Sequence, residues 1–248
     1  MMRPAIHYTG GAKEIAGISF YTPCMNRTSF LKQTLPKNLE ALKNIQNVEF
    51  VVLNYNSKDD LDDFMKSFQK EMDIGRLSYY KENTREKYHH SHAYNMASRL
   101  CIKKIICVTN ADYFVSLEWY EFVINNMKKN YFIYNEYSGD ATGRNAFWKK
   151  DFEKLGGFDE KMCEWGYEDT DMYNRAKIMG LNGISLVNKK QFWNCISHSW
   201  DIRCQNHNWD NENIAKNRSP NTFKINPDGF GKGIIIEKNL QKVKIELR

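Results

Sequence analysis

The residues suited to chemistry fall into three groups, of which the first is Asn110-Ala111-Asp112, directly after the apolar run 104–109. A carboxylate at the end of a buried strand is well placed to hold a divalent metal beside a bound phosphate. A turn is the alternative, because Asn and Asp often close strands by bonding to their own backbone. Taken alone, the motif favours the turn.

The second group is an acidic run in which Glu168, Asp169 and Asp171 stand within four residues. Carboxylates this close repel one another unless a helix N-terminus, a cation or a substrate compensates. We therefore predict that Asp169 caps a helix beginning at Thr170. Capping does not explain Trp165-Gly166-Tyr167 just upstream, an aromatic stretch of the type that stacks on sugar rings. Together the two features are as consistent with a functional site as with a cap.

The third group contains Cys195 and His198, three residues apart in a strand-like segment. A lone histidine is more often a hydrogen-bonded structural residue than a ligand. His198 gains weight as a ligand only if Asp112 needs a partner. Zinc is disfavoured, because no second Cys or His stands at close zinc-ligand spacing.

Other cysteines and histidines give weaker signals. Cys24 and Cys163 have no His and acid near them in the sequence, and neither a GxSxG nor a P-loop pattern occurs, so hydrolase and ATPase functions are disfavoured. His89, His90 and His92 cluster where a helix is expected to begin. They could be ligands, but we favour a role in capping and solvating that helix end.

Composition excludes several classes of protein. The chain has 248 residues, 42% of them apolar and 14% aromatic, which is too rich for a disordered or collagen-like protein. No run approaches the ~20 apolar residues of a membrane span, and the N-terminus lacks the apolar core of a secretory signal. Six cysteines without a CxxC pair indicate reduced thiols in a cytoplasmic protein. The net charge of +6 permits an anionic ligand but does not argue for nucleic acid.

Hydrophobic periodicity predicts the elements that position these groups. In the first half they are strands 17–22, 48–53 and 104–109 and helices 30–45, 59–72 and 90–100. This alternation predicts an α/β fold with a mostly parallel sheet covered by helices. Ligands of such sheets bind beyond the carboxyl ends of the strands, here at residues 22–27, 54–57 and 110–112.

The second half is less regular. We expect helices 116–127, 149–155 and 170–179 and strands 131–137, 184–187 and 192–197. The whole chain, 1–248, is expected to form one domain with a nucleotide-binding half (about 17–112), an acceptor and metal half (113–201) and a C-terminal extension (202–248). Residues 233–248 mix apolar and basic side chains; they could contact an anionic membrane, but a strand or helix covering the core is favoured.

In this order the three groups resemble the GT-A glycosyltransferases, most closely the beta-1,4-galactosyltransferase type, with general similarity to the large inverting bacterial family. Residues 23–27 resemble the donor-binding proline-x-x-Asn-Arg segment, and residues 110–112 stand in the place of the DxD motif. Residues 143–158 resemble the stretch leading to the acceptor loop, and residues 165–171 resemble the Trp-Gly-x-Glu-Asp-Asp-Asp signature. His198 matches the metal-binding His, so the similarity spans about residues 18–201.

The resemblance implies a single GT-A domain that transfers a sugar, galactose or N-acetylgalactosamine, from a UDP-sugar with inversion, using Mn²⁺. Asp169 would be the general base, and Glu168 would hydrogen-bond the acceptor. The implied metal ligands are Asp112, His198 and Cys195, which stands where the family has Met. The implied donor-binding residues are Thr22, Pro23, Asn26, Arg27, Asn54, Tyr55, Asn110 and Ala111. The implied acceptor-binding residues are Trp165, Gly166 and Tyr167.

Two other functions remain open. A nucleotidyltransferase of related architecture would want a Gly-rich loop after the first strand, and residues 22–27 contain no Gly. A catalytically silent sugar-binding protein on the same fold is compatible with Asn110, which replaces the first acid of DxD, whereas the intact acids and His198 argue against it. For the enzyme we expect a glycan or lipid-linked acceptor, as in polysaccharide biosynthesis, and a location in the cytoplasm or at the inner face of the membrane.

Overall fold

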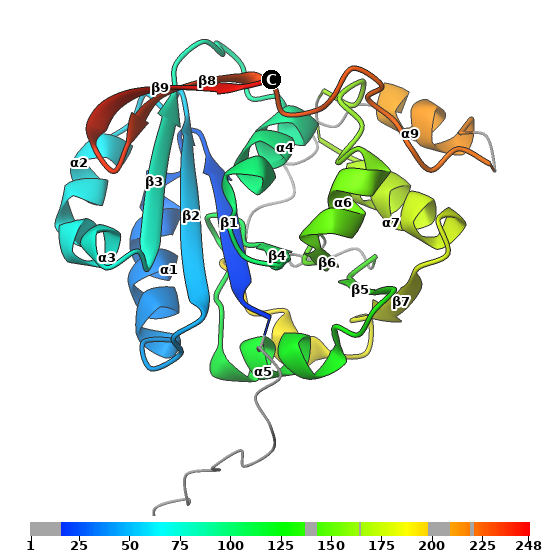
Figure 1. The fold of residues 1–248 in the computed structure, drawn as a ribbon, viewed down its shortest axis with the longest axis horizontal. Coiled ribbons are helices and arrows are strands. Elements are labelled where there is room, and N and C mark those ends of the chain that lie inside the picture. Colours follow the sequence, from blue (N-terminus) through cyan, green and yellow to red (C-terminus); the bar gives the residue numbers. More distant parts are fainter. Residues whose placement is uncertain (1–15, 137–142, 164, 198–208, 219–220) are drawn as a thin grey trace, which may run out of the picture.

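The computed structural model describes residues 16–136, 143–163, 165–197, 209–218 and 221–248, and its strands form one nine-stranded sheet (Figure 1). The strand order is β7-β5-β6-β4-β1-β2-β3-β8-β9. The strands are β1 (Ile18–Cys24), β2 (Val48–Tyr55), β3 (Leu77–Glu82), β4 (Ile105–Val108), β5 (Tyr131–Tyr134), β6 (Ala146–Trp148), β7 (Asn182–Ser185), β8 (Gly233–Lys238) and β9 (Gln241–Leu247). Strands from each region of the chain therefore share one sheet.

The centre of the sheet is parallel and its flanks are mixed. β1 lies between β2 and β4 and runs parallel to both, and β3 extends the parallel set beyond β2. β6 runs antiparallel to β4, so the N-terminal end of β6 meets the carboxyl ends of β1 and β4 at one edge. The predicted α/β class is confirmed. The sheet is less parallel than predicted, because β6 and β8 join it in the antiparallel direction.

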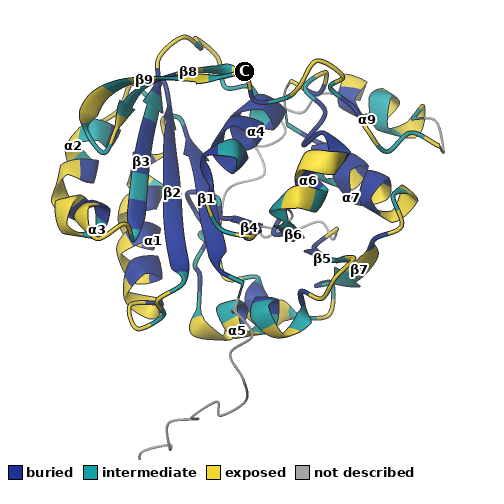
Figure 2. Cartoon of the chain, viewed as in Figure 1, coloured by how far each residue is buried: buried dark blue, intermediate teal, exposed yellow. Residues whose placement is uncertain are grey.

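Helices cover both faces of the sheet, and two apolar clusters mark the two layers of core (Figure 2). One cluster contains buried side chains of α1 (Thr28–Ala41), α2 (Leu61–Met65), η1 (Lys66–Phe68), α3 (Gln69–Asp73), α5 (Leu117–Asn126) and η2 (Lys190–Phe192). The other contains side chains of α4 (His90–Leu100), α6 (Lys149–Leu155) and α7 (Glu168–Ile178). Alternation along the strands supplies both, since Phe20 belongs to the first cluster and Tyr21 to the second.

Local pattern explains the helices that were predicted well. Leu31, Leu35 and Leu39 of α1 recur at four-residue spacing, and all three are buried in the first cluster. α4 and α6 have the bounds expected from the sequence. α6 ends at Gly156, whose φ of 81° is the left-handed conformation that glycine adopts readily at a helix end.

Several elements differ from the prediction. β3 and β6 were not predicted, and the expected helix 59–72 is divided into α2, η1 and α3. The expected strand 192–197 is reduced to one isolated bridge at Cys195, preceded by η2. α9 (Trp209–Lys216) lies in the polar stretch that was expected to be irregular. β6 is only three residues long, and such a short strand is specified by its neighbours rather than by its own periodicity.

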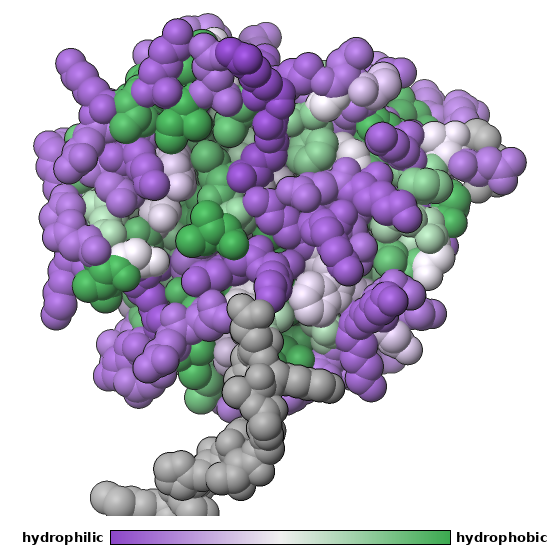
Figure 3. Space-filling model, in the orientation of Figure 1, coloured by the Kyte–Doolittle hydropathy of each residue, from purple (hydrophilic) through white to green (hydrophobic). Residues whose placement is uncertain are grey.

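The C-terminal segment forms a hairpin, β8 and β9, that extends the sheet beyond β3. Along β9 exposed Lys242 and Lys244 alternate with partly buried Val243 and Ile245, as expected of a strand with one face on the core. Charged side chains on an edge strand also discourage pairing with other chains. The face seen in Figure 3 is largely hydrophilic, with apolar atoms in separate patches. Within the described part of the chain, no helix has both the length and the apolar character needed to cross a bilayer.

Candidate functional site

The predicted donor segment lies where β1 ends beside β2, and a network of short polar side chains shapes it. The backbone N–H of Asn26 donates to Ser57 Oγ at 2.6 Å, and Asn26 Oδ1 accepts from the N–H of Lys58 at 2.8 Å. Asn26 and Asn56 both have positive φ, 55° and 56°, which Asn tolerates better than most residues. Two loops that are distant in the sequence are thereby held against each other at the carboxyl edge of the sheet.

The predicted donor residues differ in what they present. Asn26 and Arg27 are exposed at this edge. Thr22 is buried and its hydroxyl donates to the Thr109 carbonyl. Asn54 and Tyr55 point into the protein, where Asn54 Nδ2 donates to Tyr79 Oη and Tyr55 Oη lies 2.8 Å from His92 Nδ1. Pro23 and Ala111 are buried as well. Their role in donor binding stays a prediction, and for Asn54 and Tyr55 the geometry favours support of the loop from inside.

The metal motif is held in place from α1. Thr34 Oγ1 donates to the Ala111 carbonyl at 2.6 Å, and Asn38 Nδ2 donates to the Tyr113 carbonyl at 3.0 Å. These bonds fix the backbone on both sides of Asp112, whose side chain is almost entirely buried. Asn110 accepts a hydrogen bond from Tyr94 of α4. Residues 110–112 thus form an anchored turn, the alternative favoured by the sequence, and metal binding by Asp112 stays a prediction.

The segment carrying Cys195 lies alongside Asp112. Cys195 bridges antiparallel to Tyr113, and the N–H of Ile196 donates to the Asp112 carbonyl at 2.9 Å. Burial lowers the pKa of the Arg144 guanidinium, and the nearby Cys195 and Asp112 oppose this lowering in part. His198 lies outside the described residues. The described residues contain no group of three His, Cys, Asp or Glu side chains that could hold a metal, so they supply at most two of the three predicted ligands.

The acidic run forms a tight turn that leads into α7. Gly166 has a φ of 117° and Tyr167 has a φ of 64°, a left-handed conformation that is costly for a non-glycine residue and is concentrated at functional sites. The N–H of Gly166 donates to Glu168 Oε2 at 2.7 Å. Trp165 and Tyr167 are partly exposed, as acceptor contacts should be. α7 begins at Glu168, so the predicted cap at Asp169 is wrong: residues 168 and 169 are in the first turn, where the helix dipole favours acids.

Asp169 is not a helix cap, and its side chain lies against Gly143, in the segment that leads into β6. Its Oδ2 is so close to Gly143 that a Cβ built on this glycine would be 2.6 Å away. Enclosure raises the pKa of Asp169 well above its usual value, and the neighbouring charge of Glu168 raises this pKa further. The side chain nevertheless stays partly exposed. A partly exposed carboxyl with a raised pKa is a stronger proton acceptor than an ordinary aspartate, which suits a general base.

The charges of Asp112 and Asp169 both influence the pKa of Tyr94 and the pKa of Tyr113. The pKa of Tyr113 and that of Tyr94 are raised mainly by burial, and both are raised further by the charges of Asp112 and Asp169. The contacts agree: Asp169 lies against Gly143, and the next residue, Arg144, lies 4.8 Å from the ring centre of Tyr113, which follows Asp112. The two carboxylates therefore lie near each other, between the end of β4 and the start of α7. Their joint location is what the predicted chemistry needs.

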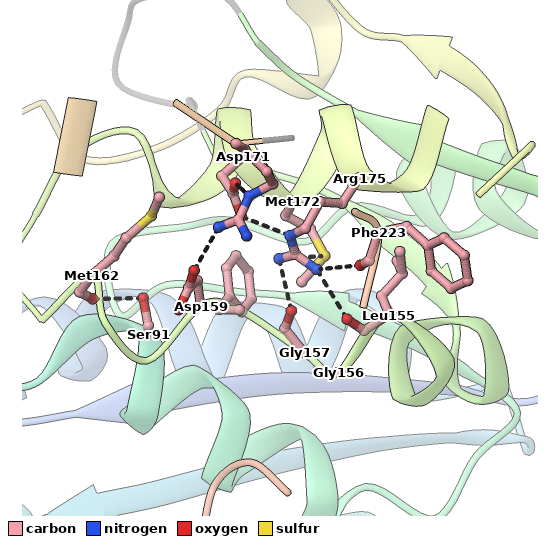
Figure 4. Close-up of polar contacts among 12 residues, drawn as sticks. Ser91, Leu155, Gly156, Gly157, Asp159, Met162, Asp171, Met172, Arg175 and Phe223 are labelled. Atoms are coloured by element: carbon pink, nitrogen blue, oxygen red, sulfur yellow. Dashed lines mark hydrogen bonds and ion pairs between the residues drawn. The ribbon is translucent and has the colours of Figure 1, made fainter. Parts of the chain in front are cut away.

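The last acid of the run has a different task. Asp171 Oδ2 accepts from Arg175 Nε at 2.7 Å, and Asp171 Oδ1 pairs with Arg218. Arg175 reaches from α7 to the carbonyls of Leu155 and Gly157 (Figure 4). Asp171 thus ties α7 to the end of α6 and to the C-terminal extension rather than facing the site.

Replacing Asp171 with Ala should destabilise the fold by about 3–5 kcal/mol, because it leaves the fully buried Arg175 guanidinium without its carboxylate. Denaturant unfolding would measure this. Asp63→Ala is the matched control, since it removes an exposed pair with Lys66 and should cost about 0–1 kcal/mol. Equal losses for the two variants would contradict a structural role for the Asp171 network.

Sequence reasoning missed residues that hold the site together. Arg144 is almost entirely buried, donates to the carbonyls of Phe114 and Asn194, and lies 4.8 Å from the ring centre of Tyr113. Asn211 of α9 donates to the Gly166 carbonyl at 2.9 Å and so supports the turn at residues 165–168, which we call the aromatic turn. No local pattern marks either residue, because each acts on a segment that is distant in the sequence. Cys24 was disfavoured as a nucleophile, and the structure agrees, because burial raises the pKa of its thiol to about 12.

A family model described as the N-terminal domain of galactosyltransferase matches residues 124–199. This segment contains β6, the aromatic turn, α7 and Cys195. A comparison of the sequence with curated proteins finds no match.

Solved structures of glycosyltransferases superpose on the chain. The catalytic domain of Drosophila beta1,4galactosyltransferase 7 in complex with xylobiose has a TM-score of 0.59 at 14% identity, over 94% of this chain and 93% of that one. A mannosyltransferase from Pyrobaculum calidifontis in complex with GDP-Man and Mn²⁺ has a TM-score of 0.59 at 17% identity, over 71% and 56%. GalNAc-T7 with UDP, GalNAc and Mn²⁺ also has a TM-score of 0.59, at 11% identity, over 70% and 43%.

The chain has the GT-A glycosyltransferase fold. The resemblance seen in the sequence is confirmed by this fold and by the matched segment. The chain spans about half of the length of the mannosyltransferase and less than half of that of GalNAc-T7. At these identities the GT-A structures establish the architecture, and the reaction has to be argued from the residues of this chain.

Proposed function

We propose that this GT-A chain transfers a sugar from a UDP-linked donor to a hydroxyl of a glycan or lipid-linked acceptor, with inversion at the anomeric carbon. The observation that supports the proposal is the proximity of the two acids: Asp169 lies against Gly143, and the next residue, Arg144, packs on the ring of Tyr113 beside Asp112. One carboxylate can serve the phosphate end of a donor while the other receives a proton at the acceptor end. Galactose or N-acetylgalactosamine is the donor sugar that the family resemblance suggests.

The reaction needs only one displacement. The acceptor oxygen attacks the anomeric carbon, the bond from that carbon to the phosphate oxygen breaks, UDP departs, and the hydroxyl proton passes to Asp169. Positive charge develops on the sugar and negative charge on the leaving diphosphate. Arg27, exposed where β1 ends, is a cation placed to meet the diphosphate. The Trp165 and Tyr167 rings would pack against the acceptor.

A divalent metal fits the donor end. Asp112 offers an oxygen ligand of the kind that Mn²⁺ and Mg²⁺ prefer, Cys195 is beside it, and His198 follows three positions later. GT-A structures with a bound nucleotide or nucleotide-sugar and Mn²⁺ support the assignment. When bound, such a cation would offset the charge of the leaving diphosphate. A thiolate is a softer ligand than oxygen and suits Mn²⁺ less well. Asp112 is therefore the principal proposed ligand, and Cys195 is a weaker one.

Titration of UDP into the protein with and without Mn²⁺ tests the donor assignment. We expect UDP to bind more tightly with Mn²⁺, and Asp112→Asn to weaken only the metal-dependent part, by about 10- to 100-fold. Asp63→Asn, at an exposed position far along the chain, is the control and should leave both titrations unchanged. UDP affinity that ignores both Mn²⁺ and Asp112 would contradict the assignment.

The titration combined with an assay of UDP release separates the silent alternative, which stays open because Asn110 replaces the first acid of DxD. Metal-dependent binding of UDP together with no release of UDP from UDP-galactose or UDP-N-acetylgalactosamine, on any acceptor, would favour a sugar-nucleotide-binding protein over an enzyme.

A further inference from the structure

His90 joins the two ends of the site. It is the first residue of α4, and its side chain lies between the turn of residues 165–168 and the end of β4. On one side its Nδ1 is 3.3 Å from Glu168 Oε1. On the other side its ring lies 4.5 Å, centre to centre, from the ring of Tyr94, whose hydroxyl donates to Asn110. Nothing in the proposed displacement uses this histidine.

Glu168 is buried beside that nitrogen. Its side chain is only 2% exposed, and its Oε2 already accepts from the N–H of Gly166. A buried polar group is costly unless it is hydrogen-bonded, and His90 Nδ1, which makes no hydrogen bond within the described residues, faces Glu168 Oε1 at 3.3 Å. Burial raises the pKa of Glu168 to about 7 and lowers the pKa of His90 to about 3. The histidine is therefore neutral at physiological pH and can donate or accept at Nδ1 according to its tautomer.

The first turn of α4 also holds the loop that leads to the aromatic turn. The N–H of His90 donates to the Cys163 carbonyl at 3.2 Å, and Ser91 Oγ donates to the Met162 carbonyl at 2.8 Å (Figure 4). His89 caps the helix by accepting from the N–H of His92, which confirms the predicted capping role for His89 alone. His92 is not a solvated end residue, because it is buried against Tyr55 and the Lys232 carbonyl. The backbone of His90 thus fastens one arm of the loop to this helix end, and its side chain lies against the other arm at Glu168.

Resting on the proposed function, we propose that His90 is a positioning residue for the acceptor: through Glu168 it sets the 165–168 turn that carries the acceptor contacts. Both oxygens of Glu168 face protein groups, so its effect on the acceptor is exerted through this turn. The donor end does not depend on His90 in the same way, since Asn110 is reached only through the ring of Tyr94, and α1 holds the backbone beside Asp112.

Three substitutions distinguish the contact between His90 Nδ1 and Glu168 from the packing of the histidine ring. His90→Phe keeps a ring beside Tyr94 and removes Nδ1. His90→Asn removes the ring but places an amide where Nδ1 was. Glu168→Gln keeps the bond to the 166 N–H and removes the charge. Melting temperatures and circular dichroism identify any variant that fails to fold. If His90→Phe fails, Glu168→Gln replaces it, with the same expected rise in acceptor KM and unchanged donor KM.

The kinetic test uses UDP-galactose and UDP-N-acetylgalactosamine as donors and a panel of p-nitrophenyl glycosides as acceptor probes. We expect His90→Phe to raise the KM for the best acceptor about tenfold, to change the donor KM less than twofold, and to leave slow donor hydrolysis by water unchanged. His90→Asn should recover most of the acceptor KM. A merely structural role would move donor and acceptor KM together and would not be rescued by Asn.

A substrate-free measurement completes the design. Hydrogen exchange in peptides covering residues 160–168 should be faster in His90→Phe than in the wild type and restored in His90→Asn. Unchanged exchange in these peptides, or equal changes in the two KM values, would overturn the inference. Failure of the proposed function has a different signature, because the wild type itself would then release no UDP from either donor.

Discussion

Replacing Asp169 with Asn is expected to lower kcat by about 10²–10⁴-fold, the usual contribution of a general base, while leaving the fold intact. The amide has nearly the same shape but cannot take the acceptor proton. Because enclosure and Glu168 raise the pKa of Asp169, the charged form is disfavoured in the folded protein, and removing the charge should leave the melting temperature equal or higher at neutral pH. UDP release from the donor, together with thermal unfolding, measures both effects.

The pH profile gives the same prediction an independent check. A base must be deprotonated to act, so kcat/KM of the wild type should rise with pH as Asp169 loses its proton, at a pH above the ordinary aspartate pKa. The residual activity of Asp169→Asn should lack this rise. Unimpaired sugar transfer by the variant would remove Asp169 from the reaction, and an equal loss in Asp63→Asn would show that the effect is not specific to the site.

Replacing Gly143 with Ala is expected to lower kcat by about 10²-fold without touching any group that reacts. The new Cβ would be 2.6 Å from Asp169 Oδ2, closer than real Cβ contacts allow, so the carboxylate has to move. A displacement of about 1 Å can cost this factor when a proton must be transferred in a defined geometry. Combining Gly143→Ala with Asp169→Asn should cost no more than Asp169→Asn alone, because both changes act through one carboxylate.

Backbone strain has to be separated from this displacement. Gly143 has a φ of +91°, so Ala there is strained whatever its neighbours are. Gly75 is the matched control, since its φ is +70° and a Cβ built on it meets nothing within 4 Å. Gly75→Ala should lower the melting temperature and leave kcat unchanged. If Gly143→Ala also changed only the melting temperature, the close approach of Asp169 would have no catalytic meaning.

Amphipathic patterns in the sequence predicted most of the central elements of the fold. The leucine stripe of α1, the bounds of α4 and α6 and the buried strands β1, β2 and β4 follow from periodicity that each segment contains in itself. β6 and the bridge at Cys195 do not, because three residues or a single bridge bury too little surface to specify a strand alone. β3 was missed although Tyr79 and Tyr80 are typical strand residues.

The sequence by itself determined which groups could react: acids at 112, 168 and 169, an aromatic turn before them, and the order of motifs that resembles the GT-A glycosyltransferases. Only the tertiary structure decided their tasks. It placed Asp169 against Gly143, buried Glu168 beside His90 and joined Asp171 to Arg175 and Arg218. The physical reason is that proton affinity and ion pairing depend on burial and on neighbours distant along the chain, which spacing cannot supply.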